Sequence, residues 1–302
     1  WAARRTRGVR HAILAAAGEA FFGRMTLGEA GGILYWPEAY VSRLGPHCWH
    51  KLKPCATQDE AQAAYIETCR KILQYERDEI GRGPLLDVDS SLVFKYHAMA
   101  GVDILCLESM PGDPHLMHAA IRGAARAYGK PWGTHIAMGW YGGVTLDTLY
   151  RKRWKTALLH AYIAGAEFIY PESGHYTYEN PRRGLKLGFG SAPMKAMRRI
   201  LREVWQFARL HTRPADGPQV RVGVVHGQFD GAPGLWNPVV WGQYHDRKWL
   251  AGAPERGWRF VDGFHRAEDW PNACVQGPAD VSGNPPLGQY DVVPAEADLA
   301  VL

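Results

Sequence analysis

The chain has 302 residues, of which 46% are hydrophobic, and it carries 35 Lys and Arg against 30 Asp and Glu. This composition is enough for a packed core and excludes a disordered chain. The formal charge of +5 is too small and too evenly spread along the sequence to indicate a nucleic-acid or membrane-surface protein. The longest apolar stretches fall short of the ~18 residues that a membrane span needs.

Short apolar segments alternate with amphipathic segments over most of the first 210 residues. The predicted strands are 21–29, 85–89, 102–108, 132–137 and 167–172. The predicted helices are 59–80, 91–100, 114–128, 145–164 and 191–211, and a glycine follows three of them directly, at Gly101, Gly129 and Gly165. Such alternation predicts a parallel sheet, either doubly wound or closed into a barrel.

The remainder of the chain has a different character. Residues 213–218 read Arg-Pro-Ala-Asp-Gly-Pro, which predicts a linker, and 219–226 form a clean apolar strand that starts a new unit. A second strand of that unit is predicted from residue 299 onward. We therefore place a domain boundary near residue 215, between a domain at 1–214 and the start of a second at 215–302. Because the chain starts without Met and stops inside an apolar run, we expect it to be an internal piece of a longer protein.

Polar side chains gather at the C-terminal end of every predicted strand. A (β/α)8 barrel brings all these ends to one mouth, where active sites are built. The phosphate-binding patterns GxGxxG and GxxxxGK[ST] are absent, so no nucleotide and no other cofactor is expected. The sequence therefore favours a barrel whose mouth carries Glu29, Asp87, Asp89, Glu108, His135 and Glu172.

Paired carboxylates beside aromatic side chains are typical of glycosidic bond cleavage. One carboxylic acid protonates the leaving oxygen, while a second carboxylate attacks the anomeric carbon or activates water. We expect Glu29, Glu108 and Glu172 to supply these groups. Substrate contacts are expected from sugar-stacking aromatics and from polar groups for the hydroxyls, namely Trp140, Tyr141, Asp87, Asp89, His135 and His175.

Two alternatives stay open at this point. The chain could be a non-catalytic carbohydrate-binding or scaffold barrel, because an acidic strand end often only caps a helix or fixes a loop. It could also be a metal-dependent hydrolase using Asp87, Asp89 and His135, although no HxH or HExxH spacing occurs. A serine mechanism lacks the GxSxG pattern.

Residues 161–170, Ala-Tyr-Ile-Ala-Gly-Ala-Glu-Phe-Ile-Tyr, followed by the helix to residue 211 and the strand at 218–226, are similar to one glycosidase family. The chain resembles the beta-galactosidase type, family 42 and its relatives in the retaining clan A. There a (β/α)8 barrel precedes a flavodoxin-like or glutamine-amidotransferase-like trimerisation domain. The resemblance implies that the five predicted strands are strands four to eight of the barrel, with strands one to three preceding residue 1.

This resemblance also implies residue roles and partners. It puts the acid/base glutamate on Glu29, at the end of strand four. The family's nucleophile belongs at the end of strand seven, where this chain has Thr134, His135 and Ala137 instead. The nucleophile is then Glu108 or Glu172, or the chain is a divergent or inactive relative. The implied partners are a carbohydrate and further copies of the chain through the second domain, with no nucleic acid and no membrane; the compartment, cytoplasmic or secreted, stays open.

Overall fold

The computed structural model describes residues 11–35, 37, 51–80, 83–90, 93–109, 114–137, 148–172, 177–180, 184–215, 217–229, 239–250 and 290–297. The strands are β1 (Arg24–Gly28), β2 (Leu85–Val88), β3 (Leu105–Ser109), β4 (Trp132–Ile136), β5 (Phe168–Pro171), β6 (Tyr178–Asn180), β7 (Leu185–Leu187), β8 (Val222–His226) and β9 (Tyr290–Pro294). The helices are α2 (Gly32–Tyr35), α4 (Gln58–Ile80), α5 (Phe94–Ala100), α6 (Pro114–Tyr128), α7 (Thr148–Ala164) and α8 (Ala192–Leu210), with 3-10 turns η1 (Gly18–Ala20) and η3 (Arg247–Trp249).

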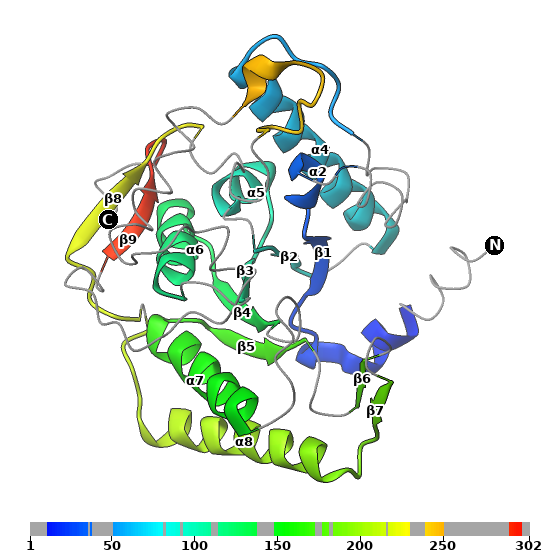
Figure 1. The fold of residues 1–302 in the computed structure, drawn as a ribbon, viewed down its shortest axis with the longest axis vertical. Coiled ribbons are helices and arrows are strands. Elements are labelled where there is room, and N and C mark those ends of the chain that lie inside the picture. Colours follow the sequence, from blue (N-terminus) through cyan, green and yellow to red (C-terminus); the bar gives the residue numbers. More distant parts are fainter. Residues whose placement is uncertain are drawn as a thin grey trace.

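The first five strands are parallel and follow one another in chain order. β1 pairs with β2, and β3, β4 and β5 form a continuous sheet. Two parallel bridges, Leu86 to Ile104 and Asp89 to Leu107, connect β2 to β3. The alternating strand–helix prediction is confirmed, and the order lacks the reversal that marks a doubly wound sheet (Figure 1). Closure into a barrel is not seen within the described ranges.

The helices pack one against the next in chain order, from α4 to α8. Their apolar faces and the strands enclose the main core, which includes Leu27, Tyr65, Leu105 and Trp132. A smaller core lies under α7 and α8, around Trp154. A glycine directly follows each of α5, α6 and α7, as predicted, and all three glycines have a positive φ. This left-handed conformation ends each helix before the next strand begins.

One aromatic contact shows that the five strands are strongly curved. Phe22, just before β1, has its ring centroid 4.8 Å from that of Phe168 at the start of β5. A flat five-stranded sheet would hold its first and last strands roughly 19 Å apart, because neighbouring strands lie about 4.8 Å from each other. Two phenylalanine side chains cannot bridge that gap, so the sheet bends its first and last strands toward each other.

β9 lies against α6, with β8 beside it, on the left in Figure 1. The predicted strand after residue 219 is confirmed as β8, but its parallel partner is β9. The strand predicted from residue 299 onward lies outside the described residues. β9 approaches α6 so closely that a Cβ on Gly123 would lie 2.0 Å from the carbonyl oxygen of Val292. Only a glycine fits at this contact.

Buried ion pairs fasten β9 to α6. Arg122 Nε donates to Asp291 Oδ1 at 2.6 Å, and Arg126 Nη1 donates to Asp291 Oδ2 at 2.5 Å. Arg122 and Asp291 are both buried. Nearby, the buried Lys95 Nζ donates to the carbonyl oxygens of Gly227 and Gln228, at 2.5 and 2.8 Å. The chain after residue 215 is therefore held to the helical layer by buried charges as well as by apolar packing.

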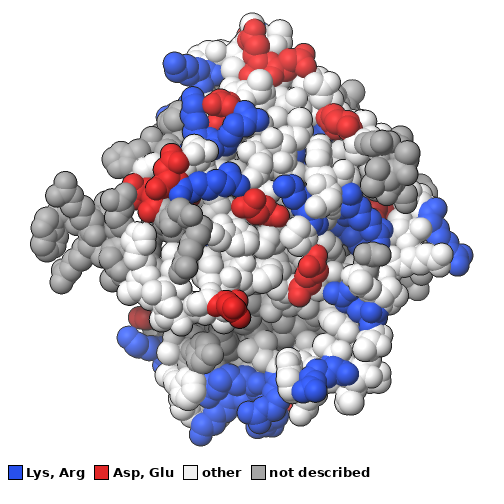
Figure 2. Space-filling model, turned by 180° about the vertical axis from the view of Figure 1, so that it is seen from behind, with Lys and Arg blue, Asp and Glu red and all other residues white. Residues whose placement is uncertain are grey.

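Charge is less evenly spread than the sequence total suggests. α7 and α8 together contain nine Lys and Arg and one acidic residue, a net charge of +8 in a chain whose total is +5. The prediction that charge is evenly spread along the sequence is therefore wrong. Acidic residues elsewhere in the chain offset these basic residues in the net charge. Figure 2 shows Lys and Arg gathered at the lower end of the molecule, the end at which α8 lies in Figure 1. The nine basic residues of the two helices are Arg151, Lys152, Arg153, Lys155, Lys195, Arg198, Arg199, Arg202 and Arg209.

Within the described residues, no helix combines the length and the apolar character that a membrane crossing requires.

A histidine between α6 and α7 makes the fold sensitive to acid. The ring of His160 lies 5.0 Å from that of His115 and 4.7 Å from that of His118. Burial, assisted by the nearby His115 and Arg122, lowers the pKa of His160 to about 4. Between pH 6.5 and 4 this histidine therefore binds a proton in the unfolded chain but stays neutral in the folded protein.

The stabilising contribution of neutral His160 is present above pH 6.5 and is lost as the pH falls toward 4. We expect the change from pH 7.5 to pH 4.5 to lower the free energy of unfolding by about 2.5 kcal/mol through this residue. Urea unfolding of the wild type and of His160→Gln at both pH values checks this. His135, whose pKa burial also lowers to about 4, remains in both proteins. An equal loss in wild type and variant would contradict the prediction.

Candidate functional site

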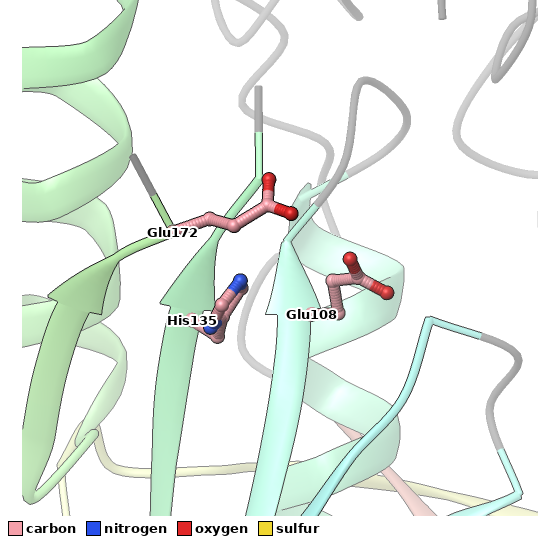
Figure 3. A group of neighbouring side chains, drawn as sticks. All are labelled: Glu108, His135 and Glu172. Carbon is pink, nitrogen blue, oxygen red and sulfur yellow. The ribbon is translucent and has the colours of Figure 1, made fainter. Parts of the chain in front are cut away.

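Three polar side chains from adjacent strand ends meet at the carboxyl edge of the sheet. Glu108 on β3 pairs in register with His135 on β4, and Glu172 directly follows β5. One ligand-capable atom from each of the three lies within 4.8 Å of the others. Figure 3 shows His135 between the two strands that supply the carboxylates, with Glu172 extended over it toward Glu108. The prediction that these strand ends converge is confirmed for the three residues.

Two further carboxylates complete the cluster. Glu29 follows β1 with a φ of 53°, and its backbone N–H donates to the carbonyl oxygen of Val88 at 2.6 Å. The Glu29 side chain forms a hydrogen bond with Glu108. Asp89 Oδ2 accepts a hydrogen bond from the backbone N–H of Gly31 at 2.7 Å. A non-glycine residue in the left-handed region costs about 1–2 kcal/mol, and such strain is typical of functional sites.

The electrostatics of the cluster favour a protonated Glu108. Burial, together with the charges of Glu29, Asp89 and Glu172, raises the pKa of Glu108 to about 9. Glu108 therefore holds a proton at neutral pH. Burial lowers the pKa of His135 to about 4, so its imidazole is neutral over the same range. The cluster thus contains a carboxylic acid, a neutral imidazole and further carboxylates within a few ångströms.

The floor of the cluster is made of groups that stay neutral. The ring of Tyr170 stands edge-on to that of His135, with centroids 4.6 Å apart. Burial raises the pKa of Tyr170 above its usual range, and the Tyr170 hydroxyl forms a hydrogen bond with Cys106, whose pKa burial also raises. Sequence reasoning missed Tyr170. Its position two residues before Glu172 was the available signal, because alternate residues of a strand share a face.

Asp87 does not belong to this cluster. It is fully buried, its Oδ2 lies 2.8 Å from His97 Nδ1 on α5, and His97 Nε2 lies 2.8 Å from the hydroxyl of Tyr65 on α4. Asp87 Oδ1 also accepts a hydrogen bond from the backbone N–H of Cys106. The hydrogen bond to Asp87 raises the pKa of His97 to about 10 although burial opposes it. The structure thus places the predicted substrate contact Asp87 apart from Glu108, His135 and Glu172, where it links α5 to the sheet.

This placement also removes the predicted metal ligand set. Asp87, Asp89 and His135 do not converge within ligand distance, although all three are described. Among the described residues, Glu108, His135 and Glu172 do converge within 4.8 Å. The predicted contacts Trp140, Tyr141 and His175 lie outside the described residues.

Asp87→Ala is expected to lower the free energy of unfolding by about 3 kcal/mol, because it leaves His97 buried without its counter-charge. Urea unfolding measures the loss, with Glu167→Ala at the exposed position before β5 as the control. A substrate-binding Asp87 would give the opposite result, an unchanged unfolding midpoint with weaker saccharide binding.

No protein-family model matches the chain, and no curated protein matches it either. The geometry of the carboxylate cluster and its surrounding residues is therefore the only guide to activity in the described part of the chain.

Proposed function

We propose that the chain carries the active site of a retaining glycoside hydrolase, which cleaves O-glycosidic bonds with a pair of carboxylates. The observation that carries this proposal is the approach of Glu108 and Glu172 to within 4.8 Å on either side of His135. Retaining enzymes hold their two carboxyl groups about 5–5.5 Å apart, whereas inverting enzymes need about 6.5–9.5 Å to admit a water molecule. The spacing supports direct attack by one carboxylate.

The same proposal extends to the fold. β1 to β5 would be strands four to eight of a (β/α)8 barrel, with the cluster at its mouth. The chain order of the strands, the adjacent packing of the helices and the contact of Phe22 with Phe168 support this arrangement. β8 and β9 would open the flavodoxin-like or glutamine-amidotransferase-like domain that the resemblance to family 42 implies.

The two carboxyl groups would have different roles. Glu108 is buried and protonated, which suits a general acid, while Glu172 is exposed and suits a nucleophile. Glu108 protonates the glycosidic oxygen as that bond breaks, and Glu172 attacks the anomeric carbon to form a glycosyl-enzyme. Water, deprotonated by Glu108, then hydrolyses this ester and restores both groups.

The remaining cluster residues would support these steps. Glu29 holds the Glu108 carboxyl group through its hydrogen bond, so the acid is assigned to Glu108 here and not to Glu29, as the family resemblance implied. The negative charges of Glu29 and Asp89 also attract the positive charge that develops in the oxocarbenium-like transition state, and this attraction stabilises it.

The test is a screen of the full-length protein against a panel of aryl glycosides. We expect turnover of at least one glycoside, with the first product released in the anomeric configuration of the substrate, as NMR spectroscopy would show. Inverted product would reject the retaining assignment. Saccharide binding without turnover on any member of the panel would reject hydrolysis in favour of the carbohydrate-binding alternative.

A further inference from the structure

We infer that Glu108, His135 and Glu172 form a binding site for a divalent transition-metal ion of the zinc type, with one imidazole and two carboxylate ligands. The three side chains come from neighbouring strand ends and hold their ligand-capable atoms within 4.8 Å of one another. This inference does not rest on the proposed hydrolysis, although it concerns the same carboxylates.

Two buried polar atoms on the side chains of the cluster have no hydrogen-bond partner among the described residues. They are Glu108 Oε2 and His135 Nδ1, on side chains that are only 5% and 8% exposed. A buried polar atom left unpaired costs about 1–3 kcal/mol. Because acidic clusters without such atoms are common on protein surfaces, these two atoms are the observation that points to a ligand. A cation held between Glu108 and His135 would supply a partner where the described residues supply none.

The surrounding charge favours a cation in the same place. The charges that act most strongly on Glu108 belong to three carboxylates, Glu29, Asp89 and Glu172. Glu108 therefore lies among three other carboxyl groups, and two of the four, those of Glu108 and Glu172, lie beside the His135 imidazole. A divalent ion would displace the proton of Glu108, which passes to the solvent, and would offset the repulsion among the carboxylates. That repulsion is larger here than in water because the surroundings are poorly polarisable.

The ligand types select the class of metal. Imidazole with carboxylate suits Zn²⁺, Co²⁺ and their neighbours, whereas Mg²⁺ and Ca²⁺ prefer oxygen ligands alone. Tetrahedral Zn²⁺ with ligands about 2.1 Å away needs ligand atoms roughly 3.4 Å apart. The cluster must therefore contract by up to about 1.4 Å, and the exposed side chain of Glu172 can supply this shift. Three protein ligands leave a fourth position open.

Metal binding and hydrolysis would exclude each other. An ion held by Glu108 and Glu172 occupies the acid and the nucleophile that we assign to glycoside cleavage. Zn²⁺ would then act as a reversible inhibitor that competes with the substrate for the same cluster.

Titration calorimetry of chelator-treated full-length protein with Zn²⁺, without any saccharide, tests the site. We expect one ion per chain, and at least about 100-fold weaker binding in His135→Gln and in Glu172→Gln. Glu167→Gln is the matched control, because Glu167 is exposed at the opposite end of β5 and should leave the affinity unchanged. Glu172→Gln, at an exposed position, keeps the test valid if His135→Gln fails to fold.

Several outcomes would overturn the inference. They are no stoichiometric Zn²⁺ binding, equal affinity in His135→Gln and wild type, or tighter binding of Mg²⁺ than of Zn²⁺. Bound Co²⁺ should also give the visible absorption of a tetrahedral site, and this band should be absent in His135→Gln.

The two proposals can fail separately. Zn²⁺ binding without hydrolysis of any glycoside would reject the hydrolase and leave the metal site standing. Hydrolysis without Zn²⁺ binding would reject the metal site alone. If both are present, Zn²⁺ should inhibit and a chelator should restore activity; activation by Zn²⁺ would reject the competition between metal and substrate.

Discussion

Replacing Glu108 with Gln is expected to lower kcat/KM on aryl glycosides by about 10²–10⁴-fold, because the amide cannot donate a proton to the departing oxygen. The loss should be greatest for aglycones that leave poorly and smallest for those that need no protonation. Steady-state kinetics over a series of aryl glycosides with different leaving groups measures this dependence. Glu167→Gln should retain wild-type kinetics.

Glu172→Gln provides the complementary result. Loss of the nucleophile should abolish turnover for every leaving group, and a small external anion such as azide should restore part of the activity by taking its place. Full activity in both Glu108→Gln and Glu172→Gln would reject the assignment. A leaving-group dependence that appears in Glu29→Gln but not in Glu108→Gln would return the acid role to Glu29.

Asp291→Ala is expected to lower the free energy of unfolding by about 3–5 kcal/mol. The change leaves the buried guanidinium of Arg122 without its carboxylate, and Arg126 loses the same partner. Urea unfolding followed by tryptophan fluorescence and by circular dichroism measures the loss. Glu203→Gln, which removes an exposed ion pair with Lys155, is the control and should leave the midpoint nearly unchanged.

The same experiment tests whether β8 and β9 unfold cooperatively with the rest of the fold. If β8 and β9 unfold together with α6, both probes should report one shifted transition in Asp291→Ala. Two separate transitions, with the main one at its wild-type midpoint, would show that the contact between β9 and α6 contributes little to the stability of the helical layer.

The convergence of Glu108, His135 and Glu172 could be predicted because it depends on little more than element boundaries. Parallel strands in a sheet bring their carboxyl ends to one edge, and the predicted strands end within about two residues of the observed ones. The chain order of β1 to β5 follows from the same alternation of strands and helices. Neither inference needed knowledge of any long-range contact.

Asp87 shows where this reasoning stops. Alternation places residues 87 and 89 on one face only in a regular strand, but β2 ends at Val88 and meets β3 through isolated bridges. The amide of Cys106 bonds to the Asp87 side chain, and His97 attracts that side chain toward the helices. The periodicity of the sequence within a strand gives no information about either of these hydrogen-bond partners.

Long-range pairing limited the remaining predictions. The partner of β8 lies 64 residues beyond its end, counted from His226 to Tyr290, after a stretch with no periodic signal. The basic face of α7 and α8 was hidden because net charge is a sum over the chain, whereas a surface is formed by the helices that happen to pack together.

The ion pair between Arg122 and Asp291 has a consequence for how the protein is made. The two residues are 169 positions apart, so at about 5–20 residues per second a ribosome adds the carboxylate roughly 10–30 s after the guanidinium. During that interval Arg122 must stay hydrated, and the face of α6 that later receives β9 stays uncovered. A newborn chain therefore exposes this face of α6 to aggregation until β9 has been made.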